Sequence, residues 1–123
     1  MLKYKYDVTI KEAEQFAKYV FEYQEKLQLA NWDIFVTCKK LRSRNIEGET
    51  SADARDRCAT IRINKYMYSK PNYQLLALHE ILHVFLANTY YIGQCRYATQ
   101  DELYTAHEDD VTKLANILIK EKF

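Results

Sequence analysis

The sequence predicts an α+β fold in a single domain over residues 1–123. Three patterns predict it: an amphipathic helix near the N-terminus, alternation of polar and apolar residues between 32 and 64, and helical patterns after residue 72. With 48% hydrophobic and 28% charged residues the chain is typical of globular domains, and its length suffices for one core only. We expect a small, twisted, mainly antiparallel sheet of three or four strands.

The first helix is expected to begin at Thr9. Thr9 and Glu12 have the spacing of a capping box, in which each side chain accepts a hydrogen bond from the other residue's backbone. The apolar stripe that follows lies opposite Glu, Lys and Gln and consists of Ala13, Phe16, Ala17, Val20 and Leu27. We expect this helix to pack on a flat surface.

Three strands are expected in the middle of the chain. Residues 32–38 are rich in aromatic and β-branched side chains, and the members of one face are Trp32, Ile34, Val36 and Cys38. Residues 50–55 and 59–64 alternate small or apolar side chains with polar ones around a turn at Asp56-Arg57. Such alternation indicates strands with one covered face.

A buried helix is expected over residues 72–88. Asn72 can cap its start, and no Gly or Pro interrupts it before Gly93. Apolar side chains surround nearly the whole cylinder, so the helix must be buried: Leu75, Leu76, Leu78, Ile81, Leu82, Val84, Phe85 and Leu86. Residues 89–100 are expected to form a loop or lid, and residues 101–122 the last helix.

Charge and composition exclude several function classes. A formal net charge of +1 gives no long-range attraction to nucleic acid or anionic lipid, so neither is an expected partner. The N-terminus lacks an apolar signal core and no apolar stretch reaches the length of a membrane span, so we expect a cytoplasmic protein. The cysteines lack a Cys-x-x-Cys pair and are expected to be reduced thiols: Cys38, Cys58 and Cys95.

The run His79-Glu80-Ile81-Leu82-His83 lies within the predicted buried helix. Residues four apart share a helix face, so His79 and His83 can bind one metal ion. Glu80 is rotated away by about 100°, which makes it a base beside the metal and not a ligand. Unpaired, these groups would cost roughly several kcal/mol in a core. A metal removes that cost, whereas the alternative of ordinary hydrogen-bonded helix residues requires a separate partner for each.

A catalytic zinc ion needs a third protein ligand and an open position. The last helix has an apolar stripe of Val111, Leu114, Ala115 and Leu118, and steps of three and four back along it reach His107 and Glu108. Asp109 lies on the solvent face instead. Either Glu108 binds zinc while His107 forms a hydrogen bond to substrate or to a ligand, or the two exchange roles. We favour Glu108, because known catalytic ligand sets include two histidines and a glutamate.

These residues predict a zinc-dependent metallopeptidase. Zn²⁺ would acidify its bound water and polarise the scissile carbonyl, while Glu80 acts as general base and later protonates the leaving amine. His107 or a tyrosine would stabilise the oxyanion, the candidates being Tyr90, Tyr91, Tyr97 and Tyr104. We expect a monomer that acts on a protein or peptide substrate.

Several segments together resemble a known family. The segments are Asn-Trp-Asp-Ile-Phe-Val, Ala-Asp-Ala, Ala-Thr-Ile-Arg-Ile, Leu-His-Glu-Ile-Leu-His-Val and His-Glu-Asp-Asp-Val-Thr-Lys-Leu-Ala-Asn. Over residues 32–118 the chain resembles the minimal HExxH zincin domains of phages and mobile elements and, more distantly, the ImmA/IrrE and SprT-like metallopeptidases. The resemblance implies a minimal zincin-like fold with an edge strand along the cleft and Glu108 as third ligand, as in gluzincins.

The departures from related families are informative. Leu86 and Thr89 stand where metzincins have Gly and His, which excludes that class. Thr112 stands where thermolysin-like enzymes have an acid four residues after the glutamate, so the ligands must be oriented differently. No His-Gly-x-x-Trp/Phe segment of the SprT type follows.

Two other functions are compatible with the same residues. The chain could be a catalytically silent zincin-fold binding or regulatory protein, similar to an anti-repressor, that acts by contact alone. It could also hold a purely structural zinc, although such a site needs no base and Glu80 is present.

Overall fold

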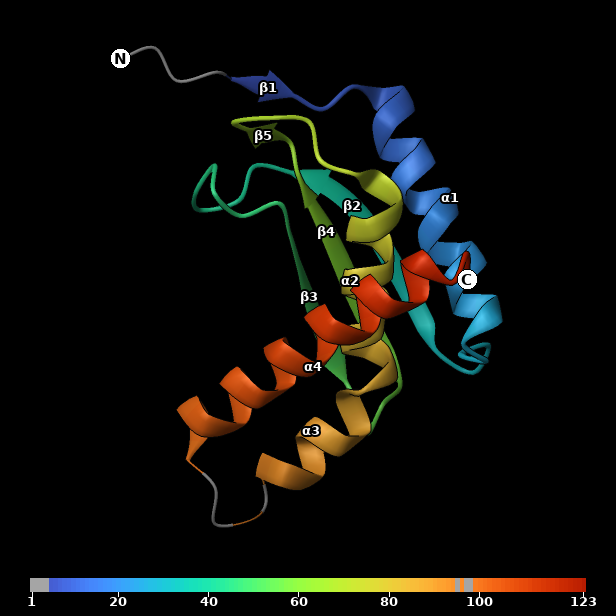
Figure 1. Cartoon of the computed structure of the whole chain (residues 1–123), viewed down its shortest axis with the longest axis vertical. Coiled ribbons are helices and arrows are strands. Elements are labelled where there is room, and N and C mark those ends of the chain that lie inside the picture. The colour runs from blue at the N-terminus through green and yellow to red at the C-terminus, as the bar shows by residue number, and fades with distance from the viewer. Residues whose placement is uncertain (1–4, 95, 97–98) are drawn as a thin grey trace.

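The computed structural model describes residues 5–94, 96 and 99–123; Cys95 and Tyr97, both discussed above, lie outside this part of the chain. The elements follow the order β1 (Tyr6–Asp7), α1 (Ile10–Lys26), β2 (Asp33–Lys39), β3 (Gly48–Asp53), β4 (Cys58–Asn64), β5 (Tyr66–Met67), α2 (Tyr73–Phe85), α3 (Ala87–Gln94) and α4 (Gln100–Lys120). Figure 1 shows α2 at the centre, between the sheet, α1 and α4. The predicted α+β class is confirmed.

The main sheet has the strand order β2-β4-β3. The expected antiparallel pairing holds for β3 with β4, and also for the two-residue strands β1 and β5, whereas β2 and β4 run parallel. The main sheet is therefore mixed, with β3 at one edge. The predicted turn is present between β3 and β4, where Asp53 accepts hydrogen bonds from the backbone of Arg55 and Asp56.

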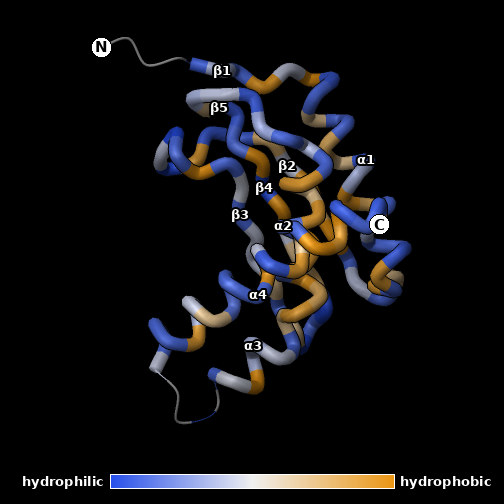
Figure 2. The backbone as a smooth tube through the Cα atoms, in the orientation of Figure 1, coloured by the Kyte–Doolittle hydropathy of each residue, from blue (hydrophilic) through white to orange (hydrophobic). Residues whose placement is uncertain are grey.

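The core lies between α2 and one face of this sheet. Ile61 and Ile63 of β4 are fully buried, as are Leu78 and Ile81 of α2. Figure 2 shows the matching stretches of apolar colour along β4 and α2. The alternation predicted for β2 is confirmed, because Ile34, Val36 and Cys38 pack against the core while Phe35 is 61% exposed on the other face. The core side chains of β2 and β4 therefore lie on the face of the sheet that α2 covers.

Helix α1 begins with the predicted capping box at Thr9 and Glu12. Its buried residues are Phe16, Val20 and Tyr23. We expected this stripe to cover a flat surface, but α1 lies mainly along α2, and its contact with the sheet, chiefly at β2, is much smaller. The reason is that α2 is apolar on nearly every side, so one helix and one sheet must both cover it.

Helix α2 is capped by Asn72 as predicted but ends at Phe85, three residues before the expected end. The chain bends by 47° and continues as α3. Residues 89–94 are thus helical, and the prediction of a loop from 89 was wrong for this segment. Nothing in the sequence breaks the helix here. Gly93 lies against Leu103 of α4, where an added Cβ would be 2.7 Å from Leu103 Cδ1, so glycine permits this close approach.

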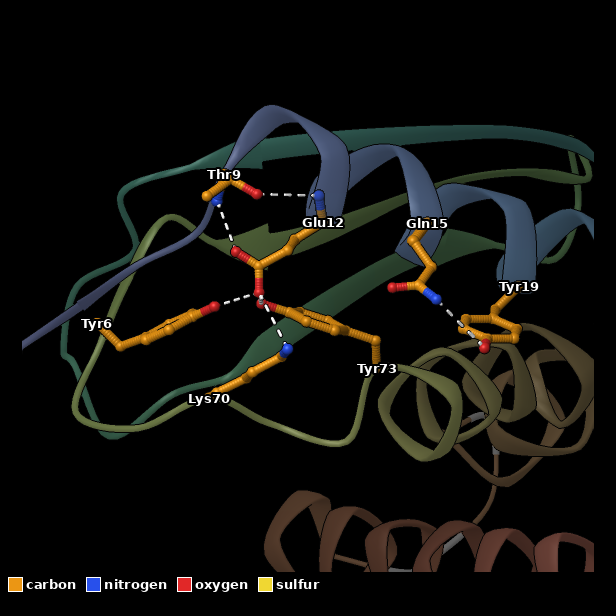
Figure 3. A network of polar contacts seen from close by, with 7 residues as sticks. All are labelled: Tyr6, Thr9, Glu12, Gln15, Tyr19, Lys70 and Tyr73. Carbon is orange, nitrogen blue, oxygen red and sulfur yellow. Dashed lines mark hydrogen bonds and ion pairs between the residues drawn. The ribbon is translucent and has the colours of Figure 1, made fainter.

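A polar cluster joins the N-terminal elements to the start of α2 (Figure 3). The carboxylate of Glu12 accepts hydrogen bonds from the hydroxyls of Tyr6 and, at 2.9 Å, Tyr73, and from the backbone of Thr9 at 3.1 Å. The ammonium group of Lys70 lies 3.8 Å away. These donors, led by Tyr6, lower the pKa of Glu12 to about 2. The hydrogen bonds of Glu12 therefore link β1, α1 and α2.

Within the described residues, no single helix has the length and apolar character to cross a membrane. Only α2 and α3 taken together reach that length, across their 47° bend. Most of α2 is buried in the core.

Candidate metal centre

Three potential ligands converge between α2 and α4. His79 and His83 lie one turn apart on α2, and Glu108 faces them from α4. His83 Nε2 lies 3.0 Å from Glu108 Oε1, and His79 Nε2 lies 3.6 Å from Glu108 Oε2. One ligand atom from each of the three residues falls within 4.8 Å of the others. The three donor atoms could thus surround one metal ion.

Both histidines are neutral near pH 7. Burial lowers the pKa of His79 and lowers that of His83 to about 3, against a smaller opposite effect of Glu108 on His79. Their contacts with Glu108 are therefore not ion pairs between charged groups. A neutral imidazole has a free lone pair on one nitrogen, which is the form that binds a metal.

Glu80 lies beside the donors but points toward β3. Its side chain is buried, with 3% of the residue exposed, and Thr50 Oγ1 donates a hydrogen bond of 2.7 Å to Glu80 Oε1. Burial raises the pKa of Glu80 to about 7; the bond from Thr50 opposes this shift, and the carboxylate of Glu108 adds to it. At neutral pH Glu80 can therefore either accept or release a proton.

Gly48 provides the space in which Glu80 sits. A Cβ at this position would lie 3.3 Å from Glu80 Oε2 and 3.0 Å from the backbone oxygen of Arg62. Sequence reasoning missed both Gly48 and Thr50. The only available signal was the rarity of glycine, which occurs twice in the chain.

A cleft of about 680 Å³ opens over the donors. Strand β3 forms one wall, and α3 and α4 form the other. Of the predicted oxyanion donors, Tyr90, Tyr91 and Tyr104 all line this cleft. A second hollow of about 300 Å³ lies on the other side of His79 and Glu80, which line both spaces. His79 and Glu80 therefore lie where the two hollows adjoin, whereas His83 and Glu108 line the larger one.

His107 also reaches the site. Its Nε2 lies 2.8 Å from His83 Nδ1, the nitrogen that faces away from Glu108. The aromatic ring of Tyr90 also lies against His107, with 4.6 Å between ring centroids. The structure thus places Glu108 among the donors and His107 against one of them, whereas Asp109 is exposed and pairs with Lys113 at 2.8 Å.

The chain matches no protein-family model, no curated protein and no solved structure. The resemblance to minimal zincin domains therefore stays a prediction.

Proposed function

We propose that the protein is a zinc-dependent metallopeptidase that hydrolyses a peptide bond in a protein substrate. The observation that carries this proposal is the convergence of His79, His83 and Glu108 beside the buried carboxyl group of Glu80. Two neutral imidazoles and one carboxylate match a known set of catalytic zinc ligands.

The donor set fits a catalytic metal better than a closed structural one. Three protein donors leave a position free for water or substrate, and the donors line an open cleft. When bound, zinc would supply a Lewis acid that polarises the scissile carbonyl and acidifies water. His79, His83 and Glu108 would hold the ion.

Glu80 is the proposed general base. Thr50 Oγ1 donates a hydrogen bond to its Oε1. Gly48 lies against its Oε2, and a side chain at position 48 would crowd the carboxylate. With a pKa of about 7, Glu80 can take the proton of the attacking water and return it to the leaving amine. A purely structural zinc site would not require such a base.

An extended polypeptide is the proposed substrate. Among the described strands, β3 pairs with β4 alone, so its outer edge faces the cleft with unpaired backbone groups. An extended peptide can add to such an edge through main-chain hydrogen bonds. Space on both sides of His79 and Glu80 would accommodate the chain before and after the scissile bond.

Glu80→Gln tests this function directly. The amide cannot accept the proton, so hydrolysis of fluorescein-labelled casein should fall by about 10²- to 10⁴-fold while zinc affinity is retained. Glu12→Gln, a carboxylate-to-amide change remote from the cleft, is the matched control and should leave the rate unchanged.

The same pair of variants separates the alternative function. A catalytically silent regulatory protein would bind zinc but hydrolyse no protein in either its natural or its Glu80→Gln form. Hydrolysis that survives Glu80→Gln at full rate would also refute the proposed role of this residue.

A further inference from the structure

Both ring nitrogens of His83 have a partner. Nε2 lies 3.0 Å from Glu108 Oε1, and Nδ1 lies 2.8 Å from His107 Nε2. Among the described residues, the polar contact of His79 is made through Nε2, with Glu108 Oε2 at 3.6 Å. The two histidines of the motif are therefore supported differently, and His107 makes the difference.

A histidine that binds a metal through Nε2 must carry its proton on Nδ1. This Nδ1–H usually donates to a carboxylate or a backbone carbonyl, which fixes the tautomer and the orientation of the ring. In this protein the atom in position to accept it is Nε2 of a third histidine, His107.

We propose that His107 is a positioning residue, whose Nε2 accepts a hydrogen bond from His83 Nδ1–H and thereby directs His83 Nε2 at the metal. The inference rests on the proposed function, because it assigns a role toward the same zinc ion. His107 is not itself a ligand, since its Nε2 is engaged with His83 and the converging donor group comprises His79, His83 and Glu108.

The surroundings of His107 keep its ring in place. The His107 ring contacts the rings of both His83 and Tyr90, with centroid distances of 4.8 and 4.6 Å. Tyr90 is held in turn by Gln100, whose Nε2 donates a hydrogen bond of 2.7 Å to the Tyr90 hydroxyl. An acceptor held by two ring contacts is suited to orienting a ligand, because little rotamer freedom is lost when the metal binds.

In this arrangement, His83 and His107 would have different tautomers with and without zinc. Without zinc, His83 Nε2–H donates to the carboxylate of Glu108, so His83 Nδ1 accepts from His107 Nε2–H. If His83 Nε2 held zinc, the proton of His83 would be on Nδ1, this Nδ1–H would donate to His107 Nε2, and the proton of His107 would be on its own Nδ1. Each imidazole keeps one proton, and the direction of the hydrogen bond between them is reversed.

Two substitutions test this role. His107→Gln can accept the hydrogen bond through its amide oxygen, whereas His107→Leu fills similar space without an acceptor. Competition with a chromophoric zinc chelator should show about 10- to 100-fold weaker zinc binding in His107→Leu and near-native binding in His107→Gln. Thermal unfolding of both zinc-free variants serves as the folding control.

Spectroscopy supplies the readouts that a merely structural role would not change. Long-range ¹H–¹⁵N spectra of the natural protein should show the proton of His107 moving from Nε2 to Nδ1 as zinc is added. The visible absorption of the cobalt-substituted protein should be the same with Gln at position 107 as with His, because the ligands are unchanged.

Native zinc affinity in a folded His107→Leu variant would overturn the inference, and so would a His107 tautomer that does not change. A changed cobalt spectrum in His107→Gln would make His107 a ligand instead. If the natural protein binds zinc and hydrolyses casein in these cases, only the role of His107 fails. If it binds no zinc, the proposed function fails as well.

Discussion

Glu12 and Glu80 are two carboxyl groups at the same helix, α2, and their environments are opposite: Glu12 belongs to α1 and contacts Tyr73 at the start of α2, whereas Glu80 belongs to α2 itself. Glu12 accepts hydrogen bonds from Tyr6, Tyr73 and Thr9, and its pKa falls to about 2. Among the described residues, Glu80 accepts one side-chain hydrogen bond, from Thr50; burial, together with a smaller effect of nearby acids, raises its pKa to about 7. The supply of donors and the degree of burial decide which carboxyl group stays charged.

The difference separates a structural carboxylate from a reactive one. A carboxylate saturated with donors has no tendency to take up a proton at neutral pH and instead joins chain segments (Figure 3). A carboxyl group with one donor and a raised pKa can exchange protons with a substrate. The same chain uses both arrangements along one helix.

The largest expected effect is an opposite pH dependence of stability in the zinc-free protein. The lowered pKa of Glu12 contributes stability above its unfolded value of 4.5 that is lost as pH falls toward 2. The raised pKa of Glu80 means that the native state holds a proton more tightly, so stability falls as pH rises from 4.5 to 7.

Urea unfolding from pH 3 to 8 measures both slopes. Glu12→Gln should flatten the acidic part of the profile, and Glu80→Gln the part between pH 4.5 and 7. A natural protein whose stability does not change over both ranges would contradict the assigned environments.

Thr50→Val sharpens the comparison by removing the hydroxyl group that donates a hydrogen bond to Glu80. A hydrogen bond to a charged group contributes about 1.5–3 kcal/mol, so the pKa of Glu80 should rise by roughly one unit or more. In the profile of kcat/KM against pH, the acidic limb should move to higher pH by the same number of pH units. Thr60→Val, a matched change on the outer face of the sheet, should not shift the acidic limb. Equal profiles for the natural protein, Thr50→Val and Thr60→Val would exclude the role of Thr50.

Tyr73→Phe tests the other carboxylate and should have the smallest effect. Loss of one hydrogen bond to Glu12 should lower the free energy of unfolding by about 1–2 kcal/mol at pH 7 and leave zinc affinity unchanged. Tyr19→Phe is the control, because its hydroxyl only accepts a weak contact of 3.5 Å from Gln15, also drawn in Figure 3. A loss of zinc affinity in Tyr73→Phe would mean that the two regions are coupled.

The sequence alone was sufficient for features that depend on local spacing. The capping box at Thr9, the cap at Asn72 and the shared face of His79 and His83 all follow from helical geometry. The inward direction of Glu108 followed from the apolar stripe of α4, in which Val111 and Ala115 are buried.

Features that depend on distant segments could not be predicted in this way. The contact of Thr50 with Glu80 requires that β3, thirty residues earlier in the chain, lies at the edge of the sheet next to α2. Strand alternation gives the faces of β2 but not its parallel pairing with β4. The bend after Phe85 has no breaking residue to indicate it, because neither Gly nor Pro stands at residues 85–88.

X-ray absorption at the zinc edge, on protein loaded with one equivalent of zinc, tests the central claim most directly. We predict one ion per chain, bound by two imidazole nitrogens at about 2.0–2.1 Å together with oxygen ligands. The Glu108→Ala variant should lose the carboxylate from this set, and His107→Gln should keep the full set. A site with three imidazoles or with sulfur, or a protein that holds no zinc after desalting, would contradict the assignment of His79, His83 and Glu108.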